Sequence, residues 1–192
     1  MCAEIIRCDW ANRNPLMREY HDTEWGVPLH DERGLFAMLM LEGQQAGLSW
    51  ATILARKQSF FAAFADFDPE VLALCGDGEV ERLMGDEGII RNRRKIAAVF
   101  DNARACLKIC EKHGSLDRFF WSYVDYKPIV NAWTSFGSVP ASTALSGRIS
   151  ADLKKFGFKF VGPTIVYAFM QSVGMVNDHL VSCAFYRRGH SV

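Results

Sequence analysis

The chain has 192 residues, 49% of them hydrophobic, which favours one domain, or one with a small appendage, around a sizeable core. Its 22 basic and 22 acidic residues cancel, which excludes a broadly polycationic surface, so any nucleic-acid binding needs a local basic patch. No apolar run approaches a membrane span, and the N-terminus lacks the apolar segment of a signal peptide. We therefore expect a cytoplasmic protein without a membrane partner, whose six cysteines are thiols or metal ligands.

Helical periodicity dominates the chain and no convincing alternating strand pattern appears, so the predicted fold class is all-α. In chain order, the predicted helices cover residues 31–45, 49–64, 69–74, 79–85, 92–112, 115–124, 142–156, 163–173 and 178–185. Capping and proline signals mark helix starts at Ser49, Asp68-Pro69 and Gly162-Pro163. Glycines mark helix ends at Gly114, Gly157 and Gly174. The polar segment 131–143 is predicted to be a loop.

The first predicted helix carries a carboxylate on an apolar face. Glu42 shares that face with Leu35 and Leu39, and a glutamate seldom lies inside unless it is paired or used. Trp50 follows in the first turn of the next helix. A carboxylate among aromatic rings suits a flat ligand that is cationic or rich in hydrogen-bond donors. The alternatives are that Glu42 caps or pairs within the fold, for instance with an arginine, and that Trp50 belongs to the core.

Segment 80–100 predicts two helices joined by the turn "GDEGIIR", which contains Gly88 and Ile89. Backbone N–H groups at the start of the second helix would be exposed, and phosphate binds readily there. The densest basic run of the chain stands beside this turn, at Arg91, Arg93, Arg94 and Lys95. We interpret the segment as the place where a chain of zero net charge would grip a DNA backbone. The alternative is a solvated charged face on an ordinary helical hairpin.

The two ends of the chain contain a potential metal site. On a helix, His179 and Cys183 would point to one place, and Cys8 and His21 supply a second pair. Two Cys and two His form the closed ligand set of a structural zinc ion. The alternative is that these residues are unrelated, and substitute ligands are available at Cys2, His30 and His190.

Such a site would clip together two chain ends that otherwise fray. It would also hold Trp10 and Tyr20, which flank two of the ligands, in place. Four protein ligands leave no open position for water, so the ligand set argues against a zinc hydrolase.

Five long motifs, in a specific order, resemble the type I 3-methyladenine DNA glycosylases, a branch of the helix-hairpin-helix glycosylases. They are "RCDW", "YHDTEWGVP", "LFAMLMLEGQQAGLSW", "EGIIRNRRKI" and "FGFKFVGPTIVYAFMQSVGMVNDH". The resemblance implies a helix-hairpin-helix domain over residues 29–164. It also implies a discontinuous subdomain, residues 1–28 plus 165–192, built around one structural zinc ion.

The resemblance also implies residue roles. The zinc ligands would be Cys8, His21, His179 and Cys183. Glu42 would be the catalytic carboxylate that hydrogen-bonds a flipped base, with Trp50 stacking on that base and Tyr20 and Trp10 lining the pocket. Gly47 and Leu48 would form the turn that fills the gap left in the duplex. Where relatives carry a pocket tyrosine, this chain has Met17.

The implied activity is removal of 3-methyladenine from alkylated double-stranded DNA, releasing the free base. No lysine is placed as a Schiff-base amine, so we expect no strand cleavage. A catalytic aspartate used by other helix-hairpin-helix glycosylases is absent from this branch, and neither Asp101 nor Asp178 matches one by motif. The main rival is a zinc-stabilised protein that binds alkylated DNA without releasing base. We expect a monomer.

Overall fold

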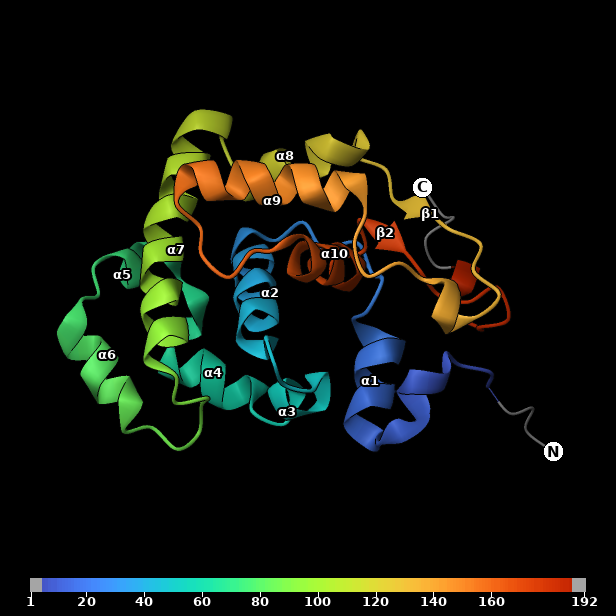
Figure 1. Cartoon of the computed structure of the whole chain (residues 1–192), viewed down its shortest axis with the longest axis horizontal. Helices are drawn as coiled ribbons and strands as arrows, with labels where there is room; N and C mark the ends of the chain where they lie inside the picture. Colours follow the sequence, from blue (N-terminus) through green and yellow to red (C-terminus); the bar gives the residue numbers. More distant parts are fainter. Residues whose placement is uncertain (1–4, 188–192) are drawn as a thin grey trace.

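The computed structural model describes residues 5–187, and this part of the chain is mostly helical, as predicted (Figure 1). Its α-helices are α1 (Pro15–Thr23), α2 (Glu32–Gln45), α3 (Trp50–Leu54), α4 (Lys57–Ala63), α5 (Pro69–Ala73), α6 (Asp77–Met84), α7 (Arg93–His113), α8 (Leu116–Trp121), α9 (Ala144–Phe156) and α10 (Pro163–Ser172). Short 3-10 helices are η1 (Asp9–Arg13), η2 (Ala65–Phe67), η3 (Ser122–Val124) and η4 (Phe136–Ser138). Two short strands, β1 (Ile129–Val130) and β2 (Val176–Asn177), pair in parallel.

Helix α2 lies at the centre of the molecule, with α7 on one side and α1 on the other (Figure 1). Every residue from Leu35 to Gln44 is buried, because the run "LFAMLMLEGQ" is apolar on almost all faces and α7, α8 and α10 pack around it. Asp31 starts the helix by accepting a hydrogen bond from the Gly34 amide at 2.7 Å. Glu42 is therefore carried into the interior by the most buried helix of the fold.

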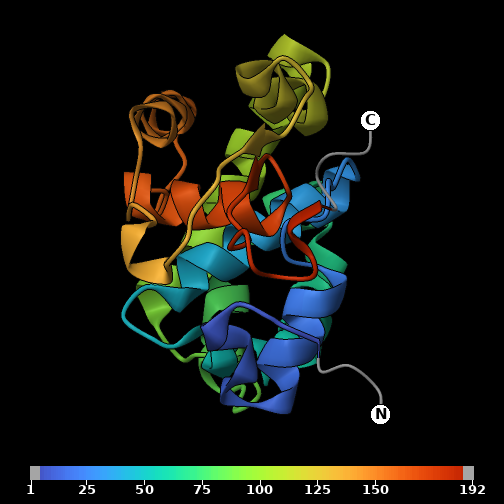
Figure 2. The same ribbon diagram turned by 90° about the vertical axis from the view of Figure 1, so that its right-hand side faces the viewer.

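The segment that follows α10 lies against the N-terminal segment (Figure 2). Backbone hydrogen bonds join Ala184 N–H to the Ile6 carbonyl at 2.9 Å and Leu29 N–H to the Val173 carbonyl at 3.1 Å. Gly174 permits this contact: its φ is +71°, and a Cβ there would lie 2.5 Å from the Pro28 nitrogen. The packing brings residues from both ends of the chain to one place.

The predicted helix 49–64 is two helices, α3 and α4, separated where Arg56 leaves helical geometry at φ −113° and ψ 6°. The sequence pattern allows a continuous helix, but α3 packs on α1 and α2 whereas α4 packs on η2. Tertiary packing therefore decides the break. Helix α1 was not predicted, although Asn14-Pro15 is a start signal of the same kind as Asp68-Pro69, and the Asn14 side chain accepts from the Met17 amide at 2.9 Å.

The predicted helix 178–185 is wrong, because this segment, which directly follows β2, forms a loop and a series of turns. Asn177 competes with helix formation: its side chain accepts from the His179 amide and donates to the Tyr186 carbonyl, at 3.1 and 2.7 Å. The fully buried Asp178 carboxylate accepts four hydrogen bonds, each of 2.7 Å, from Asn131, Trp133, Tyr167 and Gln171. Both of its oxygens are thus occupied by structural contacts.

Further predictions concern the cysteines, membrane-spanning helices and the segment 131–143. The five cysteines between residues 5 and 187 are free thiols. In the same residues no helix has both the length and the apolar character that crossing a membrane requires. Segment 131–143 is a loop interrupted only by η4, as predicted.

We predict that Asp178→Ala lowers the free energy of unfolding by at least about 3 kcal/mol, because four donors lose their acceptor inside the protein. Urea denaturation measures the change. Asp101→Ala is the matched control: Asp101 forms only surface contacts with Arg104 and Lys159, and its loss should cost less than about 1 kcal/mol. Equal losses in the two variants would contradict the prediction.

Candidate metal cluster and adjoining pocket

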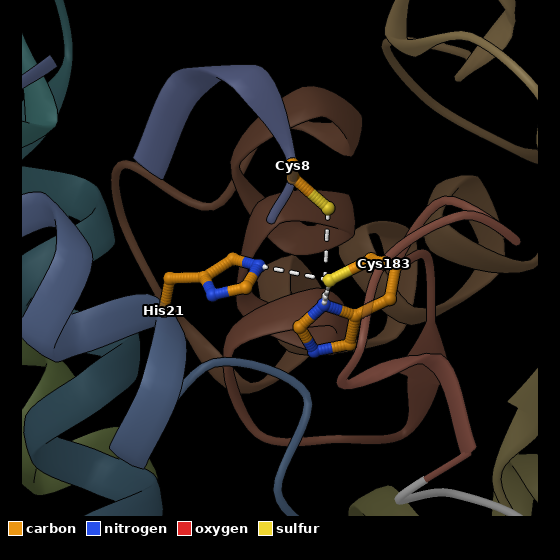
Figure 3. Close-up of side chains that lie close together, drawn as sticks. Cys8, His21 and Cys183 are labelled. Atoms are coloured by element: carbon orange, nitrogen blue, oxygen red, sulfur yellow. Dashed lines mark hydrogen bonds between the residues drawn. The ribbon is translucent and has the colours of Figure 1, made fainter. Parts of the chain in front are cut away.

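Four potential metal ligands, from both ends of the described chain, come together in the interior. All are buried, and one ligand atom from each lies within 4.8 Å of the others, in the set Cys8, His21, His179 and Cys183. Figure 3 shows Cys8, from the N-terminal segment, His21, from α1, and Cys183, from the C-terminal segment, pointing toward a common place. The predicted ligands are thus brought together although no helix joins His179 to Cys183.

The distances between these atoms suit a tetrahedral ion. Cys183 Sγ lies 3.5 Å from His21 Nε2 and 3.6 Å from His179 Nδ1, and Cys8 Sγ lies 3.8 Å from His179 Nδ1. Zinc–sulfur and zinc–nitrogen bonds at a tetrahedral angle place S and N about 3.6 Å apart. The residues present therefore fit a zinc ion bound by two cysteines and two histidines.

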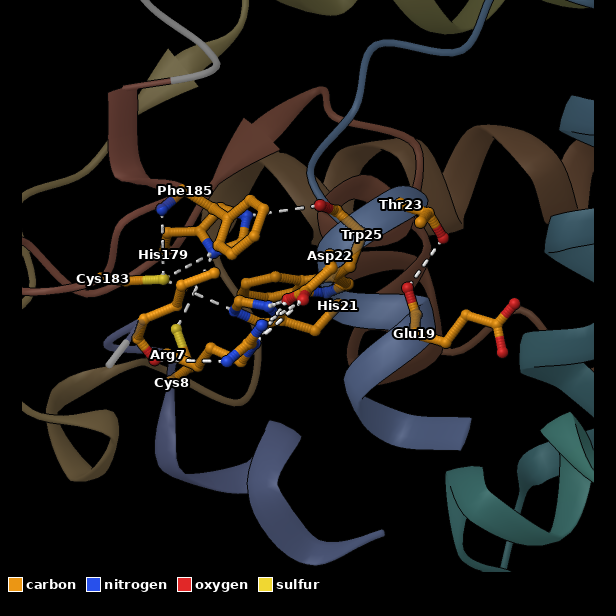
Figure 4. Close-up of polar contacts among 11 residues, drawn as sticks. Arg7, Cys8, Glu19, His21, Asp22, Thr23, Trp25, His179, Cys183 and Phe185 are labelled. Carbon is orange, nitrogen blue, oxygen red and sulfur yellow. Dashed lines mark hydrogen bonds and ion pairs between the residues drawn. The ribbon is translucent and has the colours of Figure 1, made fainter. Parts of the chain in front are cut away.

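In each histidine, the ring nitrogen that does not face the other ligand atoms lies close to an oxygen acceptor (Figure 4). His21 Nδ1 lies 2.8 Å from the Asp22 carboxylate, and His179 Nε2 lies 3.3 Å from the Trp25 carbonyl oxygen. Arg7 in turn donates to Asp22 at 2.7 Å. Acceptors at these positions fix the tautomer that presents the other ring nitrogen to a metal.

The thiols also favour metal binding. Hydrogen bonds from Cys8, His179 and His21 lower the pKa of Cys183, which stabilises the thiolate that a metal requires. Among the substitute ligands, His30 is paired with Asp117 at 2.6 Å and takes no part in the cluster. Cys2 and His190 lie outside the described residues.

A pocket of about 380 Å³ adjoins the cluster. Aromatic and polar side chains line it, contributed by Trp10, Arg13, Asn14, Met17, Tyr20, Trp25, Glu42, Gln45, Ser49, Trp50, Ala51, Phe136, Ala168, Gln171 and Ser172. Trp10 joins the two sites, since its ring meets that of His21 edge-on at 5.2 Å between centroids. The sequence-predicted residues Glu42, Trp50, Tyr20 and Trp10 therefore share one cavity.

Glu42 is the only carboxylate on the pocket lining within the described chain. It is 3% exposed, and Ser172 donates a hydrogen bond to its Oε1 at 2.5 Å. Tyr20 donates to the same serine at 3.0 Å. Oε2 has no hydrogen-bond partner among residues 5–187, and no arginine pairs with Glu42 there.

Burial raises the pKa of Glu42 to about 7, and the hydrogen bond from Ser172 opposes the rise. Tyr20 stays a neutral donor, because burial and the nearby Glu42 charge raise its pKa well above the ordinary value. Two indole groups of the lining, Trp10 Nε1–H and Trp50 Nε1–H, are buried without a partner in the described structure. The pocket thus offers a flat ligand one carboxylate acceptor and a lining of aromatic rings.

The turn after α2 is rigidly held. Gly47 has φ +77°, which favours glycine, and Leu48 is 39% exposed at the tip. Lys95, from the first turn of α7, donates to the Gln44 and Ala46 carbonyls at 2.8 and 2.7 Å. Lys95 was predicted to contact DNA, but it is buried and its ammonium is engaged, so we assign it to holding this turn.

The other predicted DNA contacts have different environments. Ile89 is buried, so only its backbone is available to a partner, and Arg93 is paired with Glu81. Arg94 is exposed, and Arg91 is exposed with only a 3.6 Å ion pair to Glu87. Gly88, half-buried, has its amide bonded to Asp86 at 2.8 Å.

Several lining residues were not predicted, namely Arg13, Asn14, Trp25, Gln45, Ser49, Ala51, Phe136, Ala168, Gln171 and Ser172. The missed helix α1 hid part of this set, because Arg13 and Asn14 lie directly before it. Ser172 ends α10, and only the packing of α10 on α2 brings it to Glu42. No sequence spacing indicates that contact.

The fold and the site together define a helical protein with an aromatic pocket beside a buried Cys2His2 cluster. The model of the methyladenine glycosylase family matches residues 10–187, and the chain belongs to this family. It is 49% identical over 180 residues to DNA-3-methyladenine glycosylase 1 of Escherichia coli, covering 94% of this chain and 96% of that protein. The DNA-3-methyladenine glycosylase of Haemophilus influenzae is 44% identical, covering 92% of this chain and 96% of that one.

Solved structures are similar over almost the whole chain. A 3-methyladenine DNA glycosylase I superposes with a TM-score of 0.91 at 49% identity, covering 93% of this chain and 98% of that chain. A tyrosine-to-phenylalanine variant of a 3-methyladenine DNA glycosylase I, in complex with 3-methyladenine, gives 0.90 at 38% identity, covering 93% and 96%. The common fold places this chain's pocket in a family with a member that binds 3-methyladenine.

We predict that Cys183→Ser loses the metal and lowers the melting temperature by on the order of 10 °C, because a closed zinc site contributes directly to folding. Elemental analysis and calorimetry measure the two effects. Cys75→Ser, at a half-buried thiol outside the cluster, is the control and should change neither. Full metal content in the Cys183 variant would identify a different ligand.

We predict that Glu42→Gln stabilises the protein above pH 7. Folding raises the Glu42 pKa from about 4.5 to about 7, so the folded state binds the proton more tightly and stability falls as pH rises through this window. The amide removes this loss, on the order of a few kcal/mol by pH 8. Melting temperatures of the two proteins should coincide near pH 4.5 and diverge above pH 7; parallel profiles would refute the assignment.

Proposed function

We propose that this protein is a DNA-3-methyladenine glycosylase that hydrolyses the N-glycosidic bond of 3-methyladenine in alkylated double-stranded DNA. The observation that carries the proposal is Glu42, a buried carboxylate in an aromatic pocket with one oxygen unpartnered among the described residues. Relatives that span nearly the whole chain bear the name DNA-3-methyladenine glycosylase, and one neighbour holds 3-methyladenine.

Glu42 provides selection by charge. In DNA, 3-methyladenine is a cation, whereas adenine is neutral, so a carboxylate in a poorly solvated pocket favours the damaged base. The leaving base departs neutral and needs no general acid. Oε2 accepts hydrogen bonds from the base edge, which makes Glu42 the catalytic residue that touches the substrate.

Aromatic side chains supply the remaining binding energy. The rings of Tyr20 and Trp50 lie 5.3 Å apart between centroids and Trp10 stands next to Tyr20 at 6.4 Å. A base flipped against Trp50 gains about 1–3 kcal/mol from stacking. An alkylated, weakly paired nucleotide also costs less to flip than an intact one. Met17, buried on the lining, packs against the base where relatives carry tyrosine.

The DNA-binding surface combines a turn and a hairpin. Gly47 and Leu48 fill the gap left by the flipped nucleotide, and α6, the turn 85–92 and α7 form the helix-hairpin-helix element. Gly88 and the Ile89 backbone lie next to phosphate at that turn, with Arg91, Arg93 and Arg94 beside them. Because the Gly88 amide already donates to Asp86, the Ile89 amide is the backbone donor to phosphate. Arg13 extends this surface to the pocket, where it is the only Lys or Arg that lines the cavity in residues 5–187.

Cys8, His21, His179 and Cys183 hold one zinc ion, which supplies no reaction chemistry and fixes Trp10 and Tyr20 in the pocket wall. Residues 29–164 form the helix-hairpin-helix domain, and residues 1–28 plus 165–192 form the subdomain that the zinc ion links, although residues 1–4 and 188–192 of this division lie outside the described part of the chain. The support is the buried four-residue cluster and the backbone contacts between the chain ends.

The enzyme is monofunctional and leaves the strand intact, since no lysine lines the pocket in the described chain. Asp178 does not replace the catalytic aspartate of other branches, because four structural donors occupy its oxygens. We further propose that the protein acts in the cytoplasm as a monomer.

Chromatography of the bases released from methylated duplex DNA tests the proposal. The wild-type protein should release 3-methyladenine and leave intact strands, and Glu42→Ala should reduce the rate at least about tenfold, because it removes charge and hydrogen bonds made to the departing base. Retention of methylated DNA by folded, metal-loaded protein without base release would instead establish the rival function, a damage-binding protein.

A further inference from the structure

Ser172 is the residue whose side chain donates a hydrogen bond to the Glu42 carboxylate. It is the last residue of α10, it lines the pocket, and it is 4% exposed. Its hydroxyl oxygen lies 2.5 Å from Glu42 Oε1, 3.0 Å from the Tyr20 hydroxyl and 2.8 Å from the Ala168 carbonyl oxygen. Three polar groups from α1, α2 and α10 thus meet at one hydroxyl.

A hydroxyl has one hydrogen and two lone pairs, so these contacts compete. Tyr20 is a neutral donor and occupies one lone pair. The serine hydrogen then goes either to Glu42 or to the Ala168 carbonyl oxygen. An ionised carboxylate at 2.5 Å attracts it more strongly, because a charge-assisted bond is shorter and stronger than one to a neutral carbonyl. The protonated carboxyl can donate to Ser172 instead, and the hydrogen then turns to Ala168.

We propose that Ser172 is a positioning residue for base recognition: it occupies Oε1 of Glu42 and leaves Oε2 directed to the base. The inference rests on the proposed function and deepens it, since it assigns different tasks to the two carboxylate oxygens. The chain Tyr20–Ser172–Glu42 orients the carboxylate from the side of α1 and α10, while the base approaches from the pocket. Polarisation along such a chain strengthens both bonds.

The same contact favours the ionised form of Glu42. Burial raises its pKa to about 7 and the Ser172 bond opposes that rise, so removing the hydroxyl moves the pKa further upward. Three other charged or titratable groups lie around Glu42. Burial and the Glu42 charge raise the pKa of Tyr20 well above its ordinary value, Arg13 lies on the pocket lining, and Lys95 from α7 is bonded to carbonyls at the end of α2.

Ser172→Ala tests the proposal through the pH dependence of kcat/KM for 3-methyladenine release. The acidic limb, set by Glu42, should move upward by about one to two pH units, because a hydrogen bond to the charged form is lost. Ser150→Ala is the matched control: Ser150 is equally buried and donates to the Val161 carbonyl at 2.6 Å, outside the pocket. It should leave the limb in place.

Carbon-13 NMR titration of the Glu42 carboxyl, assigned by its loss in Glu42→Gln, gives a second readout that needs no activity. Its midpoint should rise in Ser172→Ala and stay constant in Ser150→Ala. An unshifted midpoint in Ser172→Ala would overturn the role of Ser172. A wild-type protein that releases no base would refute the proposed function alone, because the NMR midpoint still decides the serine's part.

Discussion

The packing of the two chain ends against each other brings together the metal cluster and one wall of the pocket. Backbone hydrogen bonds such as Leu29 N–H to the Val173 carbonyl bring α1 alongside the end of α10. The pocket then receives Tyr20 from one end and Ser172 from the other, while the interior helix α2 contributes Glu42. The four potential metal ligands also lie where the two chain ends meet. A change in this packing would alter the pocket and the metal cluster together, because Trp10 lines the pocket and its ring contacts that of His21 in the cluster.

The pocket contains buried polar groups that lower the stability of the folded protein. Glu42 loses its hydration on the most buried helix and receives one hydrogen bond in return. Two indole N–H groups nearby are buried without partners in the described structure. Such unsatisfied polar groups are rare in folded proteins, and each one lowers the stability of the folded state. The apolar surface that α2 buries and the packing of the two chain ends offset this loss of stability, and such a balance is usual at functional sites.

The sequence predicted the helical class, most helix positions and the four clustered metal ligands, because these follow from periodicity, capping and residue type. It failed where tertiary contacts override local pattern. The segment after β2 has helical spacing at His179 and Cys183, but Asn177 and Asp178 bond it into turns. Ser172 lies in a motif in which it was assigned no role, and Arg13 lies between two motifs, so only the folded arrangement shows that they line the pocket. Lys95 belonged to a basic run yet turned inward.

Lys95 has a consequence for the entropy of DNA binding. Its ammonium bridges two carbonyls at the end of α2, and the Gln44 amide donates to the Lys95 carbonyl at 3.2 Å, so α2 and the first turn of α7 are clamped reciprocally. The turn with Leu48 at its tip is therefore held in place by contacts within the protein. In the role proposed for Gly47 and Leu48, a turn held in this way would lose little conformational freedom on insertion into the duplex, which would leave more of the contact energy for opening the base stack.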